Sequence, residues 1–259
     1  MAGQLLSYKI VGKGFPVVFL HGFLESVSMW DYLKLEKMNF QSILIDLPGH
    51  GDSLNEDEDV PSIEYMAFKV KEVLIHLNIN VFSVVGHSMG GYVSLVLKNE
   101  LNISSSGFIL NCSKVVLLNS NFWEDSEEKK RDRLRILNII FLNKELFIQT
   151  AIPGLFSEKT KFENEINILT KEAIKLDAHS ISYASLAMRN RKNYKNVLET
   201  FSKDFLILQG EIDNISPLEI MISSLSEINV RLVVIKKVGH MAHIEDSQKV
   251  IYELSSFLC

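Results

Sequence analysis

The chain has 259 residues, and 47% of them are hydrophobic, which is enough apolar material for one globular core with an insertion. Its 27 Lys and Arg stand against 32 Asp and Glu, and this net charge of −5, with the signs mixed along the chain, argues against a nucleic-acid-binding protein. The two cysteines, Cys112 and Cys259, have no partner spacing and give no disulfide framework.

The N-terminal residues Met1 to Ile10 lack a basic start followed by an apolar stretch of signal-peptide length. No apolar run elsewhere reaches the length of a membrane span. We therefore expect a cytoplasmic protein with a small-molecule substrate, no membrane span and no nucleic-acid partner. The oligomeric state stays open.

Strand and helix patterns alternate in the first half of the chain. Leu5 to Val11 and Val17 to Leu20 read as strands, and the turn-rich segment Gly12 to Pro16 between them predicts an antiparallel edge hairpin. Ser42 to Ile45 is the next strand, and Ser62 to Leu77 is a helix because its apolar residues recur at steps of three and four. This alternation predicts an α/β fold with a mostly parallel, doubly wound sheet that binds ligands beyond its strands' carboxyl ends.

The pentapeptide Gly86-His87-Ser88-Met89-Gly90 follows the apolar run Val81 to Val85 and precedes a helix-like stretch, Tyr92 to Leu97. In a nucleophile elbow the chain leaves a strand, reverses sharply at a strained serine and enters a helix, so glycines are needed on both sides. The same letters also occur in surface loops. Because a serine hydroxyl needs a base, and the base needs an orienting carboxylate, the interpretation of Ser88 as nucleophile depends on the rest of the chain.

A candidate acid follows the buried strand Phe205 to Leu208. Asp213 lies in the segment after this strand, so we expect it on a loop at the strand's end. Ser216 as N-cap, Pro217 at the first helical position and Glu219 three residues after the cap predict a capping box that begins the next helix. Asp213 is therefore expected just before a helix.

A candidate base follows the next predicted strand, Arg231 to Ile235. This strand leads to Gly239 and His240, and His240 is the candidate base. His243 is close behind it, either as a buried, hydrogen-bonded histidine or on a shared helix face.

From about Phe122 to Phe201 the sequence shows no strand pattern. Helical apolar patterns replace it, as in Leu134 to Leu142 and Ile166 to Met188. We therefore expect an inserted helical cap, 122–201, and a core made of 1–121 and 202–259.

These motifs, in this order, resemble the α/β-hydrolase superfamily, and most of all its single-domain, cap-bearing serine esterase-like members. The chain order of serine, acid and histidine is the one that marks these hydrolases. His21-Gly22-Phe23 after a strand and Asp46 to Ser53 after the following strand also match the family, so that the resemblance covers nearly the whole chain. The segment Leu101 to Cys112 is longer than the family's usual link, which leaves its register open.

The resemblance implies a catalytic triad of Ser88, Asp213 and His240. Attack on an acyl carbonyl places negative charge on its oxygen, and preorganised backbone amides stabilise that charge. The amide of Met89, directly after the nucleophile, is one expected donor, and the resemblance implies that the amide of Phe23 is the other.

We therefore expect a serine hydrolase that cleaves a small or medium carboxylic ester or thioester through an acyl-enzyme. The alternatives are a carbon–carbon bond hydrolase, a cofactor-free lyase or a perhydrolase on the same triad, or a ligand receptor with vestigial hydrolysis, because a fold does not decide its function. Serine rather than aspartate at the elbow argues against dehalogenases and epoxide hydrolases. Tyr92 stands where the similar menaquinone-pathway lyase has an arginine.

The remaining candidates concern metal and substrate. The seven histidines include no cluster with zinc-ligand spacing, so we expect neither metal nor cofactor. His21 and His87 are expected either to bond backbone groups or to contact substrate, and Gly22 gives the backbone room for a close approach to it.

Two cationic segments also leave alternatives open. Arg189 either binds a substrate carboxylate or is a surface charge near a helix C-terminus. Arg131 and Arg133, in an acidic-then-basic run, either form ion pairs on a solvated helix or contact substrate.

Overall fold

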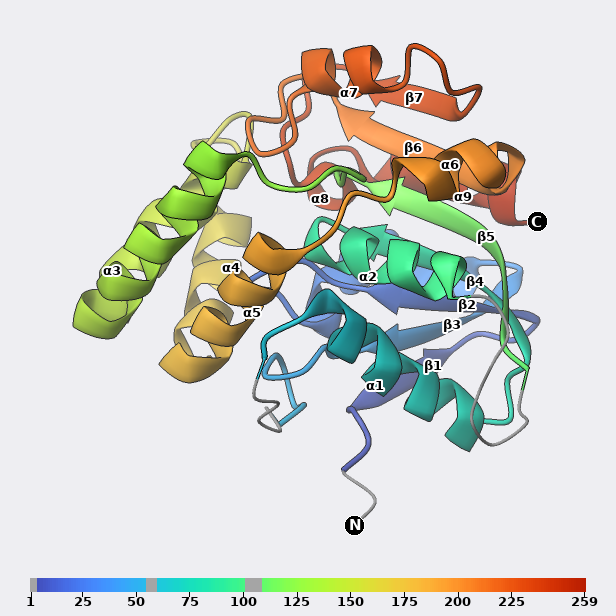
Figure 1. Cartoon of the computed structure of the whole chain (residues 1–259), viewed down its shortest axis with the longest axis horizontal. Helices are drawn as coiled ribbons and strands as arrows, with labels where there is room; N and C mark the ends of the chain where they lie inside the picture. The colour runs from blue at the N-terminus through green and yellow to red at the C-terminus, as the bar shows by residue number, and fades with distance from the viewer. Residues whose placement is uncertain (1–3, 55–59, 101–108) are drawn as a thin grey trace.

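The computed structural model describes residues 4–54, 60–100 and 109–259. These residues form a seven-stranded sheet in the order β1-β3-β2-β4-β5-β6-β7, in which β1 is antiparallel to β3 and the other pairs are parallel. The expected mostly parallel α/β sheet is thus confirmed (Figure 1). The strands are β1 (Tyr8–Val11), β2 (Phe15–Leu20), β3 (Phe40–Ile45), β4 (Val81–His87), β5 (Asn111–Leu118), β6 (Phe205–Gly210) and β7 (Arg231–Ile235).

Helices cover both faces of this sheet, because its strands are apolar on both sides. On β5, Val115 and Leu117 belong to the core under α1 and α2, whereas Val116 and Leu118 belong to the core under η1 and α9. The α-helices are α1 (Ile63–His76), α2 (Met89–Asn99), α3 (Glu127–Ala151), α4 (Glu163–Ile174), α5 (Ala178–Asn190), α6 (Lys195–Thr200), α7 (Leu218–Ser224), α8 (Ala242–Glu245) and α9 (Ser247–Leu258). The 3-10 helices are η1 (Val27–Leu33), η2 (Leu35–Lys37), η3 (Ile152–Leu155) and η4 (Ser202–Asp204).

The helix predicted at Ser62 to Leu77 is confirmed as α1. The hydroxyl of Ser62 accepts a hydrogen bond from the amide of Tyr65 at 3.1 Å and so caps the helix. Its buried face consists mainly of the residues that recur at steps of three and four.

The predicted antiparallel hairpin at the start of the chain is wrong. β1 pairs with β3, and β2 lies parallel between β3 and β4. The turn residues Gly12 and Gly14 do have positive φ, at 76° and 124°. They allow the chain to turn, but the partner of each strand is fixed by the neighbours that bury it, which a local turn signal does not specify.

The helices α3, α4 and α5 lie beyond the carboxyl ends of the strands (Figure 1). We call them the cap. They bury an apolar cluster of their own, which also takes in Leu24 and Met241 from the core. The expected helical cap between β5 and β6 is therefore present, and its boundaries at residues 122 and 201 stay a prediction.

The single helical pattern at Ile166 to Met188 is divided in the structure. α4 ends at Ile174 and α5 begins at Ala178, because Asp177 accepts hydrogen bonds from two amides of the following turn and caps α5. Within α3, Asn143 is non-helical and marks a kink.

The strand before the cap, β5, begins at Asn111. Most of the segment Leu101 to Cys112, whose register the sequence left open, lies outside the described residues. No helix in the described ranges is both long and apolar enough to cross a membrane.

Candidate active site

The predicted nucleophile elbow is confirmed as a backbone geometry. β4 ends at His87, α2 begins at Met89, and Ser88 between them has φ 48° and ψ −113°. A non-glycine residue in this region is strained and persists only where the surrounding structure holds it. A side chain on Gly86 would collide with the carbonyl of Gly90, and a side chain on Gly90 would collide with the carbonyl of Leu20, so the close packing at the elbow requires both glycines.

The carboxylate of Asp213 lies against the ring of His240. Nδ1 of His240 is 3.0 Å from Oδ1 and 2.9 Å from Oδ2 of Asp213, and both residues are buried. Asp213 also accepts hydrogen bonds from the amides of Ile215 and Ser216, at 2.8 and 3.0 Å, and from the side chain of Asn119 at 2.9 Å.

These contacts determine the ionisation of Asp213 and the tautomer of His240. Burial alone would raise the pKa of Asp213, but His240 and the hydrogen-bond donors lower it to about 2. The ionised carboxylate can only accept, so Nδ1 of His240 carries a proton and donates it to Asp213. In the neutral ring, Nε2 is then free to accept a proton.

The predicted capping box after Asp213 is wrong. α7 begins at Leu218 with Pro217 as its N-cap, and no side chain caps it. The hydroxyl of Ser216 is buried and has no hydrogen-bond partner in the described part of the chain. The amide of Ser216 donates a hydrogen bond to the carboxylate of Asp213, so this loop is organised by the carboxylate and not by a cap of α7.

Ser88 and His240 line the same cavity, whose volume is about 400 Å³. It lies between the sheet edge and the cap, and most of its wall is apolar. The apolar residues of the wall are Phe23, Leu24, Tyr92, Ile136, Phe147, Ala151, Leu155, Met188 and Ile215. Four charged side chains also line it: Glu25, Lys129, Asp132 and Arg133.

The two residues expected to supply oxyanion donors are the residue after Ser88 and a residue on the wall of the same cavity. Met89 is the first residue of α2, so its amide has no acceptor within the helix. Phe23 lines the cavity. A Cβ on the preceding residue, Gly22, would be 2.5 Å from Oε2 of Glu25, and 3.1 Å from Cβ of Ser88. Glycine is therefore needed for the loop to approach the elbow, and the roles of both amides stay predictions.

The structure places His21 and Arg189 away from the lining of this cavity. His21 is fully buried, its Nε2 accepts from the amide of Leu47 at 2.9 Å, and burial lowers its pKa to about 4. It holds two loops together. Arg189 is in the last turn of α5, and its Nη1 donates to Oδ1 of Asn190 at 3.1 Å. Gly22 is likewise absent from the lining, whereas His87 belongs to it.

Glu25 is a residue of the site that the sequence did not reveal. Its Oε2 accepts from the amide of Gly22 at 2.5 Å and lies 2.9 Å from Nδ1 of His87. The other ring nitrogen of His87, Nε2, lies 2.9 Å from the carbonyl oxygen of His240. This pair therefore links the loop before Phe23, the elbow and the loop that carries His240.

The hydrogen-bond partners indicate that His87 is charged. A carbonyl and a carboxylate are both acceptors, so both ring nitrogens of His87 must carry protons. Burial would lower the pKa of His87, but Glu25 raises it above its usual value. Glu25 is also buried, yet His87 lowers its pKa to about 2. His243 packs on His87 with 4.8 Å between ring centroids, and burial keeps its pKa well below 6.5.

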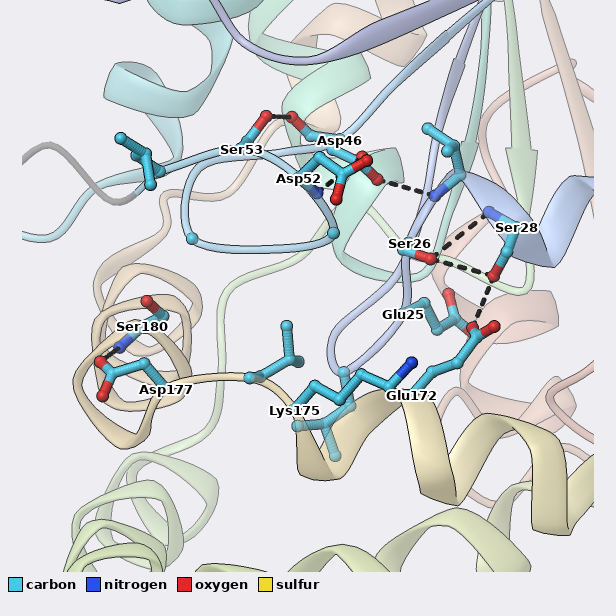
Figure 2. A pocket seen from close by; sticks show the side chains of 16 residues that line it. Glu25, Ser26, Ser28, Asp46, Asp52, Ser53, Glu172, Lys175, Asp177 and Ser180 are labelled. Atoms are coloured by element: carbon cyan, nitrogen blue, oxygen red, sulfur yellow. Dashed lines mark hydrogen bonds between the residues drawn. The ribbon is translucent and has the colours of Figure 1, made fainter.

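A second cavity, of about 580 Å³, lies between the cap and the loops that follow β2 and β3 (Figure 2). It is lined by acidic residues, most of which are hydrogen-bonded within the protein. Asp46 accepts two backbone amides at 2.8 and 3.1 Å, Glu172 accepts the hydroxyl of Ser28 at 2.6 Å, and Asp177 caps α5. None of Ser88, Asp213 and His240 lines this cavity, so we place the candidate site in the other one.

Among the described residues, no three His, Cys, Asp or Glu side chains form a group that could hold a metal ion. The expected absence of a metal stays a prediction, which chelation tests.

Comparisons with known proteins agree with this fold. A family model described as alpha/beta hydrolase fold matches residues 16–247. A 2-succinyl-6-hydroxy-2,4-cyclohexadiene-1-carboxylate synthase from Enterobacter sp. (strain 638) is 35% identical over 83 residues, which span only 32% of this chain and 31% of that protein. The Escherichia coli (strain K12) protein of the same name is 25% identical over 95% of this chain and 94% of its own.

A solved structure is similar over almost the whole chain. A thermophilic esterase from Thermogutta terrifontis, with malate bound, has a TM-score of 0.85 and 26% identity. The superposition covers 98% of this chain and 92% of the esterase.

Proposed function

This chain belongs to the alpha/beta hydrolase fold family and is a hydrolase, and we propose that it cleaves carboxylic esters or thioesters through an acyl-enzyme on Ser88. One observation carries this proposal. Ser88, on a strained elbow, and His240, bonded to an ionised Asp213, line one cavity with apolar walls. This arrangement supports the roles of Ser88 as nucleophile, His240 as its base and Asp213 as the orienter of the base.

In the first half of the reaction, Nε2 of His240 takes the proton of the Ser88 hydroxyl while Oγ attacks the acyl carbon. The carbonyl π electrons move to the oxygen, and the amides of Met89 and Phe23 stabilise the resulting negative charge. As the intermediate collapses, the bond to the alcohol or thiol breaks. The leaving group takes the proton from His240, and the acyl group stays on Ser88.

The second half repeats these steps with water. His240 removes a proton from water, the hydroxide oxygen attacks the acyl carbon, and Oγ of Ser88 leaves with the proton that His240 returns. Asp213 stays ionised throughout and holds the ring. The imidazolium of His87, through the carbonyl of His240, fixes the loop from which this ring projects.

A lyase reaction on the same triad is the second candidate, and the similarity to the Escherichia coli synthase favours it. Against it, Tyr92, which lines the cavity, stands where the resemblance to that kind of lyase implies an arginine. A test separates the two candidates: if the protein releases both an acid and an alcohol from simple esters, hydrolysis is favoured over the lyase reaction.

The proposal is tested by Ser88→Ala with p-nitrophenyl esters of increasing acyl length. We expect a loss of kcat on the order of 10⁴-fold or more with folding intact, and loss of labelling by a fluorophosphonate. Ser223→Ala is the matched control, because Ser223 is exposed on α7 and does not line the cavity. Turnover or labelling that persists in Ser88→Ala contradicts the proposal. So does a wild-type protein that cleaves none of the esters.

A further inference from the structure

The first turns of α3 place charged side chains on the wall of the cavity. Lys129, Asp132 and Arg133 line it, and their spacing of three and four residues puts them on one helix face. Arg131 lies between them in sequence but is exposed and does not line the cavity. Of the three arginines that the sequence left as possible substrate contacts (Arg131, Arg133 and Arg189), Arg133 is the one that lines the cavity.

Arg133 shares one carboxylate with a second arginine. Its Nε donates to Oδ2 of Asp125, and Nη1 of Arg191 lies 2.7 Å from Oδ1 of the same residue. The exposed fractions of the three side chains are 12%, 0% and 2% for Arg133, Asp125 and Arg191. Burial would raise the pKa of Asp125, but the two guanidinium groups hold it below its usual value. One negative charge therefore stands between two positive ones.

Arg191 is fixed in the protein by other contacts. Its Nε donates to the carbonyl of Trp123 at 3.0 Å, and its Nη1 donates to the carbonyl of Met188 at 2.8 Å. Its guanidinium lies 4.1 Å from the ring centroid of Tyr92, whose side chain lines the cavity. Its Nη2 is buried and has no hydrogen-bond partner within the described residues. These contacts orient the cation but do not neutralise it.

The neighbouring carboxylates do not supply the second negative charge that would balance Arg133 and Arg191. Asp132 pairs with Arg135 at 2.8 Å, and within the described residues Lys129 donates only to a backbone carbonyl, at 3.2 Å. Of the three glutamates of this segment, Glu124 and Glu127 pair with Lys130 at 3.4 and 2.9 Å, and Glu128 is exposed and does not line the cavity. On this wall and directly behind it, three cations (Lys129, Arg133 and Arg191) thus stand against two carboxylates (Asp125 and Asp132), which leaves an excess of one positive charge. Glu25, which also lines the cavity, is balanced by His87.

An excess of positive charge beside apolar walls attracts an anionic group, because attraction between charges is stronger where water is excluded. A guanidinium presents planar donors that match a carboxylate, and such charge-assisted hydrogen bonds are strong. The apolar side chains of the same cavity suit a hydrocarbon chain. We propose that the substrate ester carries a free carboxylate, which Arg133 binds, so that the substrates are half-esters of dicarboxylic acids or esters of hydroxy acids.

This inference rests on the proposed ester hydrolysis, and matched substrates test it. Methyl hydrogen adipate and methyl hexanoate have the same acyl chain length and differ in a terminal carboxylate. The pair 4-butyryloxybutanoate and butyl butyrate differs in the same way on the alcohol side. Hydrolysis is followed by pH-stat titration. In at least one pair we expect kcat/KM of the acidic ester to exceed that of the neutral one by about 10- to 100-fold, the scale of one charge-assisted hydrogen bond.

The ratio of acidic to neutral kcat/KM is then measured in variants. Arg133→Gln should bring the ratio close to one, mainly by raising KM of the acidic ester, and Arg133→Lys should retain part of it because the charge remains. Arg131→Gln removes the same charge from the exposed face of the same helix and should keep the wild-type ratio. A wild-type ratio near one in both pairs, or a ratio that survives in Arg133→Gln, overturns the inference.

Binding without chemistry separates this inference from the proposed function. By calorimetry, Ser88→Ala should bind methyl hydrogen adipate or 4-butyryloxybutanoate more tightly than the double variant Ser88→Ala/Arg133→Gln, by about 10-fold or more. Equal affinities in both proteins contradict the role of Arg133, even if ester hydrolysis depends on Ser88. Tighter binding that depends on Arg133, in a protein that cleaves no ester, contradicts the proposed function instead.

Discussion

The buried pair of Glu25 and His87 allows a prediction that can be worked out from its contacts. In Glu25→Gln the side chain keeps its size and one acceptor oxygen, but it loses its charge. A glutamine oxygen can still accept from the amide of Gly22 and from Nδ1 of His87. His87 then has no anionic partner, and its second proton, which bonds the carbonyl of His240, is destabilised.

The expected loss of stability follows from the pKa of Glu25. His87 and the neighbouring charges lower this pKa from 4.5 to about 2 although burial alone would raise it. Such a shift corresponds to about 3 kcal/mol of unfolding free energy. Breaking a buried ion pair by removing one partner costs about 3 to 5 kcal/mol, which agrees with this figure. We therefore expect Glu25→Gln to lower the unfolding free energy by about 3 kcal/mol.

This difference should depend on pH in a definite way. The contribution of Glu25 is complete above pH 4.5 and is lost as pH falls toward 2, because its pKa is lowered in the folded state. The contribution of His87 is complete below pH 6.5 and is lost as pH rises through its raised pKa. The wild type should therefore exceed Glu25→Gln in stability most between pH 4.5 and 6.5.

Urea unfolding followed by tryptophan fluorescence at pH 5.5 and pH 9 measures both quantities. The control is Glu199→Gln, which removes one carboxylate from an exposed pair with Lys195 at 3.6 Å and should change the unfolding free energy by less than about 0.5 kcal/mol. A loss in Glu25→Gln below about 1 kcal/mol at pH 5.5 would refute the ion pair. A loss that is the same at pH 5.5 and pH 9 would show that His87 is not its charged partner.

Three further predictions concern the chemistry. Asp213→Asn should keep the fold by circular dichroism, since an amide oxygen can accept hydrogen bonds from the backbone amides of Ile215 and Ser216. It should lower kcat by up to about 10⁴-fold, because the ring of His240 is no longer held in the right tautomer. Wild-type kcat in this variant would show that another residue is the acid. Prolonged dialysis against EDTA should leave ester hydrolysis unchanged, and a loss that Zn²⁺ restores would contradict a metal-free mechanism. Phe23→Pro removes the amide N–H and should lower kcat about 10²- to 10³-fold relative to Phe23→Ala, which keeps it. Equal kcat in the two folded variants would exclude this amide as an oxyanion donor.

The residues proposed for the triad were accessible from the sequence because each is positioned by a local rule. Ser88 is set by glycines within two residues of it and by the strand and helix on either side. Asp213 and His240 each follow a strand, and parallel strands bring their carboxyl ends to one edge of a sheet. Chain order and strand ends therefore predicted which residues gather, without any knowledge of their distances.

Features that depend on competition between partners were not accessible in this way. The turn between β1 and β2 predicted a hairpin, but β3 lies beside both strands and is the actual partner of β1. Ser216 has the sequence context of a helix cap, but in the structure its amide donates a hydrogen bond to Asp213 and its hydroxyl does not cap α7. In each case a local signal was present, and a contact with another part of the chain decided the outcome.

The charged groups around the cavity show why substrate recognition is the hardest part to predict. His87 and Glu25 are 62 residues apart, and Asp125 meets Arg191 only because the segment before α3 packs against the end of α5. Helical spacing left open whether Arg133 forms an ion pair on a solvated helix or contacts substrate, and in the structure it pairs with a buried carboxylate that precedes the helix. The elbow and the strand ends fix the proposed reacting groups, while the packing of cap helices on the core sets the charge around them. A change in that packing can therefore alter which ester is bound and leave the arrangement of Ser88, Asp213 and His240 intact.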